Sequence, residues 1–347
     1  MRVLLPVFTN QIFALEQVRS ISQYWEVETS RDAFWDNDGN FDIVLLNWPE
    51  ELTEWKEPTN LELAFVRRVL QRWAETSRIV VVRHNFHPHY ADTEPYRKLY
   101  DIVYQAAHGV VHMGHFSAAE FEKRYAKYDF LGSQAQTVIP HPIFAAYPDN
   151  VTRDEARRCL GIKRGAFMLL AFGRVQSAAE KNLVINAFSD VSVRDKIALV
   201  PGWKKTPGKE PVDRLRWLIL SSSRRFKREG RHVPEGEVAT LFRAADLVLI
   251  ARTNVLNSGL IPLGIKFDSP MVVPECGNLR ELGEALGCSL FDPDSRRSLR
   301  DAVRKSIRGS TRPPDYSQFR ELFNTEAIAR KYVAFFSALS PGSRRAQ

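Results

Sequence analysis

The 347-residue sequence predicts an α/β protein with two doubly wound parallel sheets, one in each half of the chain. Short runs of apolar, β-favouring residues alternate with stretches of helical periodicity from one end to the other. About a dozen such runs are too many for one ordinary sheet. The alternation also restarts after the polar stretch YPDNVTRD at residues 147–154, which has the composition of a linker. We therefore expect domains at 1–148 and 149–320, followed by a C-terminal helix and basic tail at 321–347.

In the first half, FDIVLLNW and SRIVVVRH are nearly continuous in apolar residues, as is typical of strands buried on both faces. The pattern predicts strands at 2–8, 41–48, 77–84, 109–113 and 137–139. Helical periodicity predicts helices at 11–24, 61–75 and 96–107. A further helix is expected to start at Ser117 as its N-cap and to end at Tyr125.

In the second half, Thr152 and Glu155 have the spacing of a capping box at the start of a helix. The apolar runs predict strands at 167–172, 196–200, 246–250, 271–273 and 289–291. The intervening periodic stretches predict helices at 181–188, 237–244, 259–267, from 278 onward, at 298–308, and between 316 and 339.

The composition limits the possible classes of protein but does not identify the function. A hydrophobic content of 44% and a charged content of 26% are those of an ordinary globular chain. The net charge of +8 suits an anionic ligand, an anionic membrane face or nucleic acid, and does not choose among them. The three cysteines lack metal-ligand spacing, which predicts buried thiols in a reducing compartment. With no signal-peptide pattern and no apolar run long enough to span a bilayer, we expect a cytoplasmic protein, with attachment to the inner membrane face left open.

Ligands of open parallel sheets bind beyond the carboxyl ends of the strands, so the residues that follow each strand are the candidates for a site. In the first half, Trp48 and Glu50 follow one strand. Six of the eight histidines also follow predicted strands: His84, His87, His89, His112, His115 and His141. The dense spacing of His84, His87 and His89 allows a metal, but no matching Asp or Cys ligands accompany it, so we expect a polar wall and no metal.

The second half carries a set of residues suited to phosphate. Arg174 follows a strand, and Lys181 lies at the start of the next helix. Two further strands are each followed by small polar residues that open a helix: Asn257, Ser258 and Gly259, and then Glu275, Gly277 and Asn278. Helix N-termini offer free N–H groups to anions, and Arg and Lys would complete a clamp for a nucleoside diphosphate. The structural alternatives are an ordinary N-cap at Ser258 and a surface ion pair between Glu275 and Arg280. Trp203-Lys204-Lys205, after another strand, would add to this site or to a basic face.

These segments resemble successive motifs of the GT-B glycosyltransferases, especially the large retaining family four and bacterial exopolysaccharide and capsule enzymes. FGRVQSAAEKN, EVATLFRAADLVLIARTNVLNSGLIPL and PMVVPECGNLREL carry the resemblance in the second half. DIVLLNWPE, VVVRHNFHPH and VIPHPIFAAYP carry it in the first half. The resemblance extends over nearly the whole chain and rests on the order and spacing of the motifs.

The resemblance implies two Rossmann-like domains facing across a cleft, with the C-terminal helix returning to the first domain. It implies metal-independent hexosyl transfer, without a cofactor, from a nucleotide-diphosphate sugar to a glycan or lipid-linked saccharide. By position, the donor would lie at Arg174, Lys181, Asn257, Ser258, Gly259, Glu275, Gly277 and Asn278. Glu50 and His84 would be the catalytic candidates, with Trp48, His87, His89 and His141 on the acceptor side.

The sequence departs from the family pattern in one respect that matters for catalysis. Many members carry two glutamates around the loop at 257–259, whereas here no glutamate occurs between Glu237 and Glu275. This leaves open a retaining or inverting reaction, a non-catalytic binding protein, and a sugar-nucleotide epimerase of the same fold. The basic run at 224–228 is expected either as a solvated edge strand or as a contact with an anionic membrane. Nucleic acid is not expected, because no nucleic-acid module accompanies the run.

Overall fold

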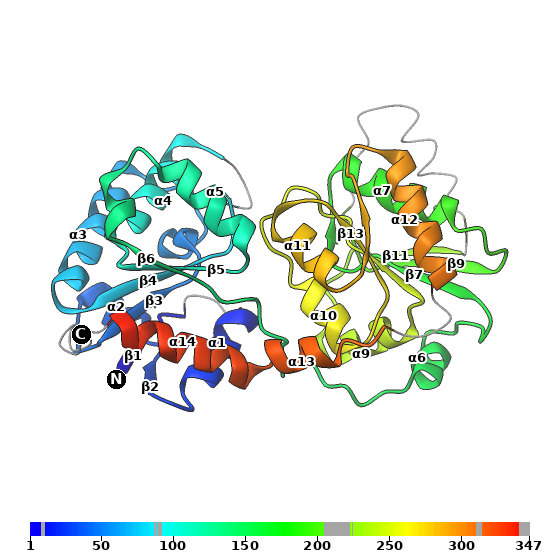
Figure 1. Cartoon of the computed structure of the whole chain (residues 1–347), viewed down its shortest axis with the longest axis horizontal. Coiled ribbons are helices and arrows are strands. Elements are labelled where there is room, and N and C mark those ends of the chain that lie inside the picture. The colour runs from blue at the N-terminus through cyan, green and yellow to red at the C-terminus, as the bar shows by residue number, and fades with distance from the viewer. Residues whose placement is uncertain are drawn as a thin grey trace. The chain divides into compact units, whose positions relative to one another are not determined.

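The computed structural model describes residues 1–7, 11–86, 88, 92–204, 223, 225–309 and 314–339. The chain forms two compact units (Figure 1). The first comprises Met1–Phe144 together with Leu322–Gln347, and the second comprises Ala145–Glu321. Each unit contains a six-stranded, wholly parallel sheet flanked by helices, which confirms the predicted α/β fold class.

The sheet of the first unit has the strand order β2-β1-β3-β4-β5-β6. Its strands are β1 (Arg2–Leu4), β2 (Glu26–Glu28), β3 (Ile43–Leu46), β4 (Arg78–Arg83), β5 (Gly109–His112) and β6 (Ala135–Val138). The central strands are buried on both faces, with Val81 of β4 opposite Leu46 of β3 and Val110 of β5. The order reverses between β1 and β3, and such a switch point opens a crevice at the carboxyl edge of the sheet.

The helices of the first unit cover both faces of this sheet. They are α1 (Ile12–Ile21), α2 (Arg31–Asp36), α3 (Asn60–Thr76), α4 (Glu94–Ala106), α5 (His115–Tyr125) and α14 (Thr325–Leu339), with short 3₁₀ turns at Pro49–Thr53 and Asp129–Ser133. The C-terminal α14 lies beside α1 (Figure 1), where Gln17 Nε2 donates to Tyr332 Oη at 2.8 Å. The prediction of Ser117 as an N-cap is wrong: Gly114 occupies that position, and the buried Ser117 hydroxyl instead meets His112 Nδ1 at 3.0 Å.

The sheet of the second unit has the order β11-β9-β7-β12-β13-β14. Its strands are β7 (Phe167–Leu170), β9 (Lys196–Val200), β11 (Phe226–Arg228), β12 (Leu247–Leu249), β13 (Met271–Pro274) and β14 (Ser289–Phe291). Counted along this sheet alone, the order is 3-2-1-4-5-6, that of the dinucleotide-binding Rossmann fold, with its switch point between β7 and β12. A separate parallel pair joins β8 (Arg174–Val175) to β10 (Gly202–Trp203).

Two helices of the second unit begin at capping boxes. The helices of this unit are α6 (Arg153–Cys159), α7 (Ala178–Asp190), α9 (Glu235–Ala244), α10 (Leu260–Lys266), α11 (Gly277–Ala285) and α12 (Arg296–Gly309), with α13 (Ser317–Phe323) at the boundary between the units. The Thr152–Glu155 capping box is confirmed at the start of α6. A second capping box, from Ser177 and Glu180, starts α7 three residues earlier than predicted.

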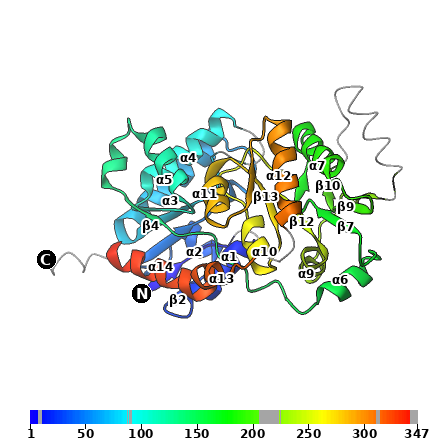
Figure 2. The ribbon, with the colours of Figure 1, turned by 45° about the vertical axis from the view of Figure 1, so that its right-hand side comes forward.

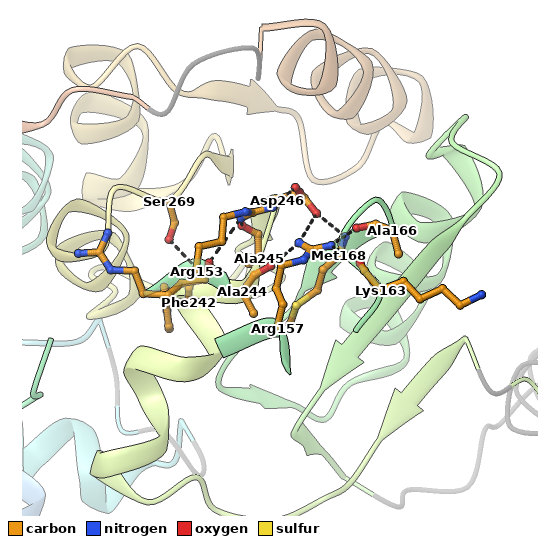
Figure 3. A network of polar contacts seen from close by, with 11 residues as sticks. Arg153, Arg157, Lys163, Ala166, Met168, Phe242, Ala244, Ala245, Asp246 and Ser269 are labelled. Carbon is orange, nitrogen blue, oxygen red and sulfur yellow. Dashed lines mark hydrogen bonds and ion pairs between the residues drawn. The ribbon is translucent and has the colours of Figure 1, made fainter. Parts of the chain in front are cut away.

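A partly buried ionic network fixes α6 to the rest of the second unit (Figure 3). Asp246, which follows α9, accepts hydrogen bonds from Arg153 and Arg157 of α6 and from the backbone N–H of Met168 in β7, the last at 2.6 Å. Arg157 is 3% exposed and also donates to the carbonyl oxygens of Ala244, Lys163 and Ala166. One carboxylate therefore joins α6, α9 and β7.

Candidate functional site

The second unit holds a cavity of about 290 Å³ at the carboxyl ends of β7, β9 and β11. This is the edge where a Rossmann-type sheet binds its ligand. Its lining comes from three loops that follow strands, together with Tyr147 and Val238 from elsewhere in the unit. The lining residues are Tyr147, Phe172, Gly173, Arg174, Gly202, Lys204, Gly230, Arg231, His232, Val233 and Val238.

Glycines allow the backbones around this cavity to approach closely. A Cβ on Gly202 would lie 2.0 Å from the carbonyl oxygen of Gly173, so no other residue fits where β10 pairs with β8. Gly230 has φ +73° and faces the carbonyl oxygen of Trp203, where an added Cβ would lie at 2.8 Å. These glycines bring the backbones of the lining loops close together, as is common where a ligand approaches a glycine-rich loop.

The cavity is cationic. Arg174 and Lys204 are exposed, and neither forms an ion pair within the described part of the chain. Arg231 is neutralised by Glu237 at 2.7 Å and Glu229 at 2.6 Å, and these hydrogen bonds raise the pKa of its guanidinium. The described residues that line the cavity include no carboxylate. Two uncompensated cations at a Rossmann-type edge are suited to a phosphate or diphosphate.

Arg174 lies in this cavity, but Lys181 does not line it. Lys181 is fully buried in the first turns of α7, with its ammonium 5.6 Å from the centre of the Trp203 ring. Burial lowers the pKa of Lys181, opposed by the adjacent Glu180. Four lining residues were not among the predicted site residues: Gly202, Gly230, Arg231 and His232. Glycine after an apolar run is a signal that could have indicated the first two.

The other predicted donor residues cluster at the ends of β12 and β13, in the middle of the same sheet edge. Asn278 Nδ2 donates to Asn257 Oδ1 at 2.5 Å, and the Asn278 backbone N–H donates to the Leu256 carbonyl at 2.9 Å. Gly277 has φ +51°, and a Cβ there would lie 2.5 Å from the Val255 carbonyl oxygen. The two loops are therefore held together, and their predicted contact with a donor stays a prediction.

This cluster adjoins the cavity through α10, because a Cβ on Gly173 would be 3.9 Å from the Leu260 side chain. Ser258 Oγ accepts from the Leu260 N–H at 3.3 Å, but the N-cap of α10 is Gly259, so the alternative of an N-cap at Ser258 is not seen. The Glu275 side chain is exposed, and Arg280 pairs with Glu284 at 3.1 Å, so the alternative of a Glu275–Arg280 pair is not seen.

In the first unit, three predicted site residues lie around Phe13 of α1. The His84 ring stacks on Trp48 with centroids 3.9 Å apart, and its Nε2 lies 3.1 Å from Asn47 Oδ1. Phe13 places its ring at 4.6 Å from that of His84 and at 5.0 Å from that of His141. Burial lowers the pKa of His141 to about 4, so this ring is neutral at neutral pH. Trp48, His84 and His141 therefore form one aromatic cluster at the carboxyl ends of β3, β4 and β6.

Glu50 lies below the surface. Its side chain is 0% exposed, and Oε2 accepts a hydrogen bond from the Tyr100 hydroxyl at 2.7 Å. Burial raises the pKa of Glu50, while hydrogen bonds from Tyr100 and Asn85 oppose that shift. A buried carboxyl with a raised pKa is found both in acid–base catalysis and in structural networks.

The remaining histidines and cysteines divide between core and surface. His112 is fully buried, with its two ring nitrogens 3.0 Å from Ser117 Oγ and from Gln136 Oε1, and so has a packing role. His115 is exposed at the start of α5, and His87 and His89 lie outside the described residues. The prediction of three buried thiols is wrong for Cys159, which is exposed, whereas Cys276 and Cys288 are half-buried and that burial raises the pKa of each thiol to about 11.

The sequence analysis also missed a buried charge in the first unit. Arg83, at the end of β4, is 1% exposed, pairs with Glu120 and donates to the Ser117 carbonyl at 2.6 Å.

Among the described residues there is no cluster of three or more metal-ligating side chains. Nor does any helix among them have the length and apolar content needed to cross a bilayer.

Comparison with known proteins bears on the fold. No family model and no curated protein sequence matches the chain. Solved structures match it along nearly its whole length, including Anabaena HepE in complex with UDP, with a TM-score of 0.69 and 15% identity over 97% of this chain and 99% of that one. A glycosyltransferase from Rickettsia africae and the sucrose-phosphate synthase of Thermosynechococcus elongatus each match with a TM-score of 0.66 and 13% identity, over 97% of this chain and 98% of theirs.

At these identities the similarity establishes the fold. The chain has the two-sheet α/β fold of the GT-B glycosyltransferases, and the resemblance noted in the sequence is confirmed to that extent. The narrower resemblance to family four and to exopolysaccharide enzymes stays a prediction.

Proposed function

We propose that this protein is a glycosyltransferase that transfers a sugar from a nucleotide-diphosphate donor, bound in the second unit, to a saccharide or lipid-linked saccharide in polysaccharide biosynthesis. One observation carries the proposal. In a fold shared with proteins solved in complex with UDP and UDP-glucose, the cavity at the carboxyl ends of β7 and β9 presents two uncompensated cations, Arg174 and Lys204.

The charge distribution supports placing the donor in the second unit. Ala145–Glu321 contains 31 Lys and Arg residues against 21 Asp and Glu, a net charge of +10, whereas the rest of the chain has 18 against 20, a net charge of −2. The whole basic excess therefore belongs to the unit with the Rossmann strand order. A positive field over that unit favours the approach of an anionic donor.

The proposed chemistry uses the same cations. As the glycosidic bond to the donor breaks, negative charge develops on the leaving diphosphate, and preorganised positive groups stabilise that charge. Arg174 and Lys204 are the side chains we assign to this task, in a reaction that needs no bound metal. On the acceptor side we assign the His84–Trp48–His141 cluster, whose flat aromatic surfaces suit the apolar faces of a sugar ring.

Thermal unfolding in the presence of UDP, GDP, ADP and dTDP tests the donor site. A nucleotide at about 100 times its dissociation constant adds roughly 2.7 kcal/mol, which for a unit of this size raises the melting temperature by about 5–10 °C. Arg174→Ala removes a charged hydrogen bond worth about 1.5–3 kcal/mol and should weaken binding by roughly 10–150-fold. Arg280→Ala is the matched control, because Arg280 is exposed in the same unit and already paired with Glu284. If no nucleotide stabilises the native chain at millimolar concentration, or both variants weaken equally, the proposed donor site is wrong.

A second candidate is a binding protein of the same fold without catalysis. It is favoured by the absence of any glutamate between Glu237 and Glu275. The transferase and the binding protein are distinguished by measuring the release of nucleoside diphosphate from a nucleotide sugar, with and without saccharide acceptors. A binding protein without catalysis releases none. An epimerase would yield a new nucleotide sugar instead, but the described cavity lining lacks the carboxylates that its acid–base chemistry would use.

A further inference from the structure

Helix α12 of the second unit is the most one-sidedly charged of the described helices. Its sequence, RRSLRDAVRKSIRG, contains six cations and one carboxylate, Asp301. Its apolar side, with Leu299, Ala302 and Val303, is buried against α7, β13 and β14. At 100° per residue, Arg297, Arg304, Lys305 and Arg308 fall on the half of the helix opposite Leu299 and Val303, whereas Arg296 and Arg300 fall on the same half as that apolar pair. The core packing explains the apolar side and leaves the basic side unexplained.

The basic side is poorly compensated. Asp301 lies 3.8 Å from both Arg297 and Arg300, and these are long contacts. Within the part of the chain that the structure covers, Arg296, Arg304, Lys305 and Arg308 have no ion-pair partner. The acidic residues nearest in sequence, Asp292 and Asp294, precede the N-terminal end of the helix, so the excess is greatest in its C-terminal half.

This arrangement carries a cost in the isolated molecule. The pairs Arg296/Arg300, Arg300/Arg304 and Arg304/Arg308 place like charges four residues apart, which destabilises a helix. A sequence that only needed a soluble outer face would be better served by interspersed acids, as in α11, where Arg280 pairs with Glu284. A surface of opposite charge would relieve the repulsion along the whole helix.

We propose that the basic side of α12 is a docking surface for an anionic lipid leaflet. The cations extend over about 18 Å along one straight helix, and no exposed aromatic or large apolar side chain accompanies them. The contact is therefore electrostatic attraction to headgroups without insertion into the acyl region. This inference does not depend on the proposed transferase function.

The packing of α12 against its neighbours favours a flat binding partner, such as a membrane surface, over the groove of a nucleic acid. α7 contacts α12 along its flank, and both views of the chain show the two helices side by side on one face of the sheet (Figures 1 and 2). A helix packed into such a layer does not project as a reading helix does in a major groove. The exposed positions also lack Asn, Gln and aromatic side chains, which contact bases.

Co-sedimentation of the full chain with vesicles tests the proposal. The vesicles are phosphatidylcholine alone or with roughly 30% phosphatidylglycerol, at about 0.05 M and 0.5 M salt. We expect binding only to the anionic vesicles and only at low salt. The test variant is Arg304→Gln/Lys305→Gln/Arg308→Gln. The control, Arg67→Gln/Arg68→Gln/Arg72→Gln, removes three exposed cations from α3 in the other unit.

Each basic residue at the surface contributes about fivefold to the partition coefficient, so the α12 variant should bind roughly 100-fold more weakly and the α3 variant much less so. A charge-conserving variant, Arg304→Lys/Arg308→Lys, should bind like the native chain and guards against a folding defect. Equal losses in the α12 and α3 variants would mean attraction by net charge alone and would overturn the proposal. So would failure of the native chain to bind anionic vesicles at low salt, or binding that depends on α12 only with a nucleic-acid duplex.

Discussion

Substitution of Asp246 by alanine probes the network that attaches α6 to the second unit (Figure 3). The variant removes the acceptor for Arg153, Arg157 and the Met168 N–H together. Arg157 keeps its backbone carbonyl partners, at 2.9 Å to Ala244 and 3.2 Å to Lys163, but has no remaining carboxylate. A guanidinium that is 3% exposed then stays in the interior without a counter-ion.

The expected loss follows from that burial. Removing one partner of a buried ion pair costs about 3–5 kcal/mol, and because Asp246 is itself 23% exposed we expect the lower end, about 3 kcal/mol. For a unit of this length, 1 kcal/mol corresponds to roughly 2–4 °C in melting temperature. Asp246→Ala should therefore unfold roughly 6–12 °C below the native chain.

Differential scanning calorimetry of the second unit's transition measures this change. Glu284→Ala is the control, because the Glu284–Arg280 pair is exposed and should be worth less than about 1 kcal/mol. The double variant Arg157→Met/Asp246→Asn removes the buried charge and keeps an oxygen for the Met168 N–H, so it should recover much of the loss. A drop of less than about 2 °C in Asp246→Ala, or a double variant less stable than the single one, would refute the reasoning.

Two further predictions concern the cavity and the core. Gly202→Ala places a methyl group 2.0 Å from the Gly173 carbonyl oxygen and forces β8 and β10 apart, so nucleotide-induced stabilisation should disappear. Gly236→Ala, which meets nothing within 4 Å, should leave it unchanged, and native-like binding by Gly202→Ala would contradict the cavity geometry. Burial lowers the pKa of His112 to about 4, so below pH 6.5 the unfolded chain takes up a proton that the folded chain excludes. Stability should then fall as the pH drops from about 6.5 towards 4, by roughly 2 kcal/mol at pH 5. His112→Gln should show a smaller loss in denaturant unfolding between pH 7 and pH 5, and equal losses would exclude His112 as a source.

The sequence predicted most of the fold because the central strands are short apolar runs whose burial is visible in their composition. β3 and β4 fall inside the predicted ranges, and β9 and β14 match them residue for residue. β2, with the sequence EVE, was missed because it is a polar edge strand whose only partner among the described strands is β1. β8 and β10 could not be predicted, since each has two residues and their pairing depends on the close approach of Gly202 to Gly173.

The location of a candidate site residue could be predicted only where the residue follows a strand, because the end of the strand fixes the edge of the sheet at which it lies. Arg174 follows the end of β7 by four residues and Asn257 follows the end of β12 by eight, so both lie at the carboxyl edge whatever the packing of the helices. Lys181 is one turn into α7, where rotation about the helix axis decides its direction. The capping box at Ser177 and Glu180 fixes that rotation, and Lys181 faces Trp203 in the core.

The two side chains predicted to be catalytic differ in what their surroundings allow. A group that takes a proton from an acceptor hydroxyl must come within about 2.6–3.2 Å of it. Glu50 has no exposed surface, and its Oε2 is engaged by the Tyr100 hydroxyl in an environment that disfavours its charge. His84 lies at the carboxyl end of β4, with Asn47 at its Nε2 and Trp48 against its face, among the rings of the proposed acceptor cluster.

Of the two, His84 is therefore the side chain we propose next to the reacting sugar, and Glu50 is the one we assign to holding the Tyr100 hydroxyl in place. The stereochemistry of the proposed reaction then depends on the role of His84. In an inverting reaction His84 would accept the acceptor proton, whereas in a retaining reaction the departing diphosphate would take it and His84 would orient the sugar. The absence of a glutamate between Glu237 and Glu275 argues against inferring retention from the resemblance to family four, because the glutamate pair typical of that family has no counterpart in this stretch of sequence.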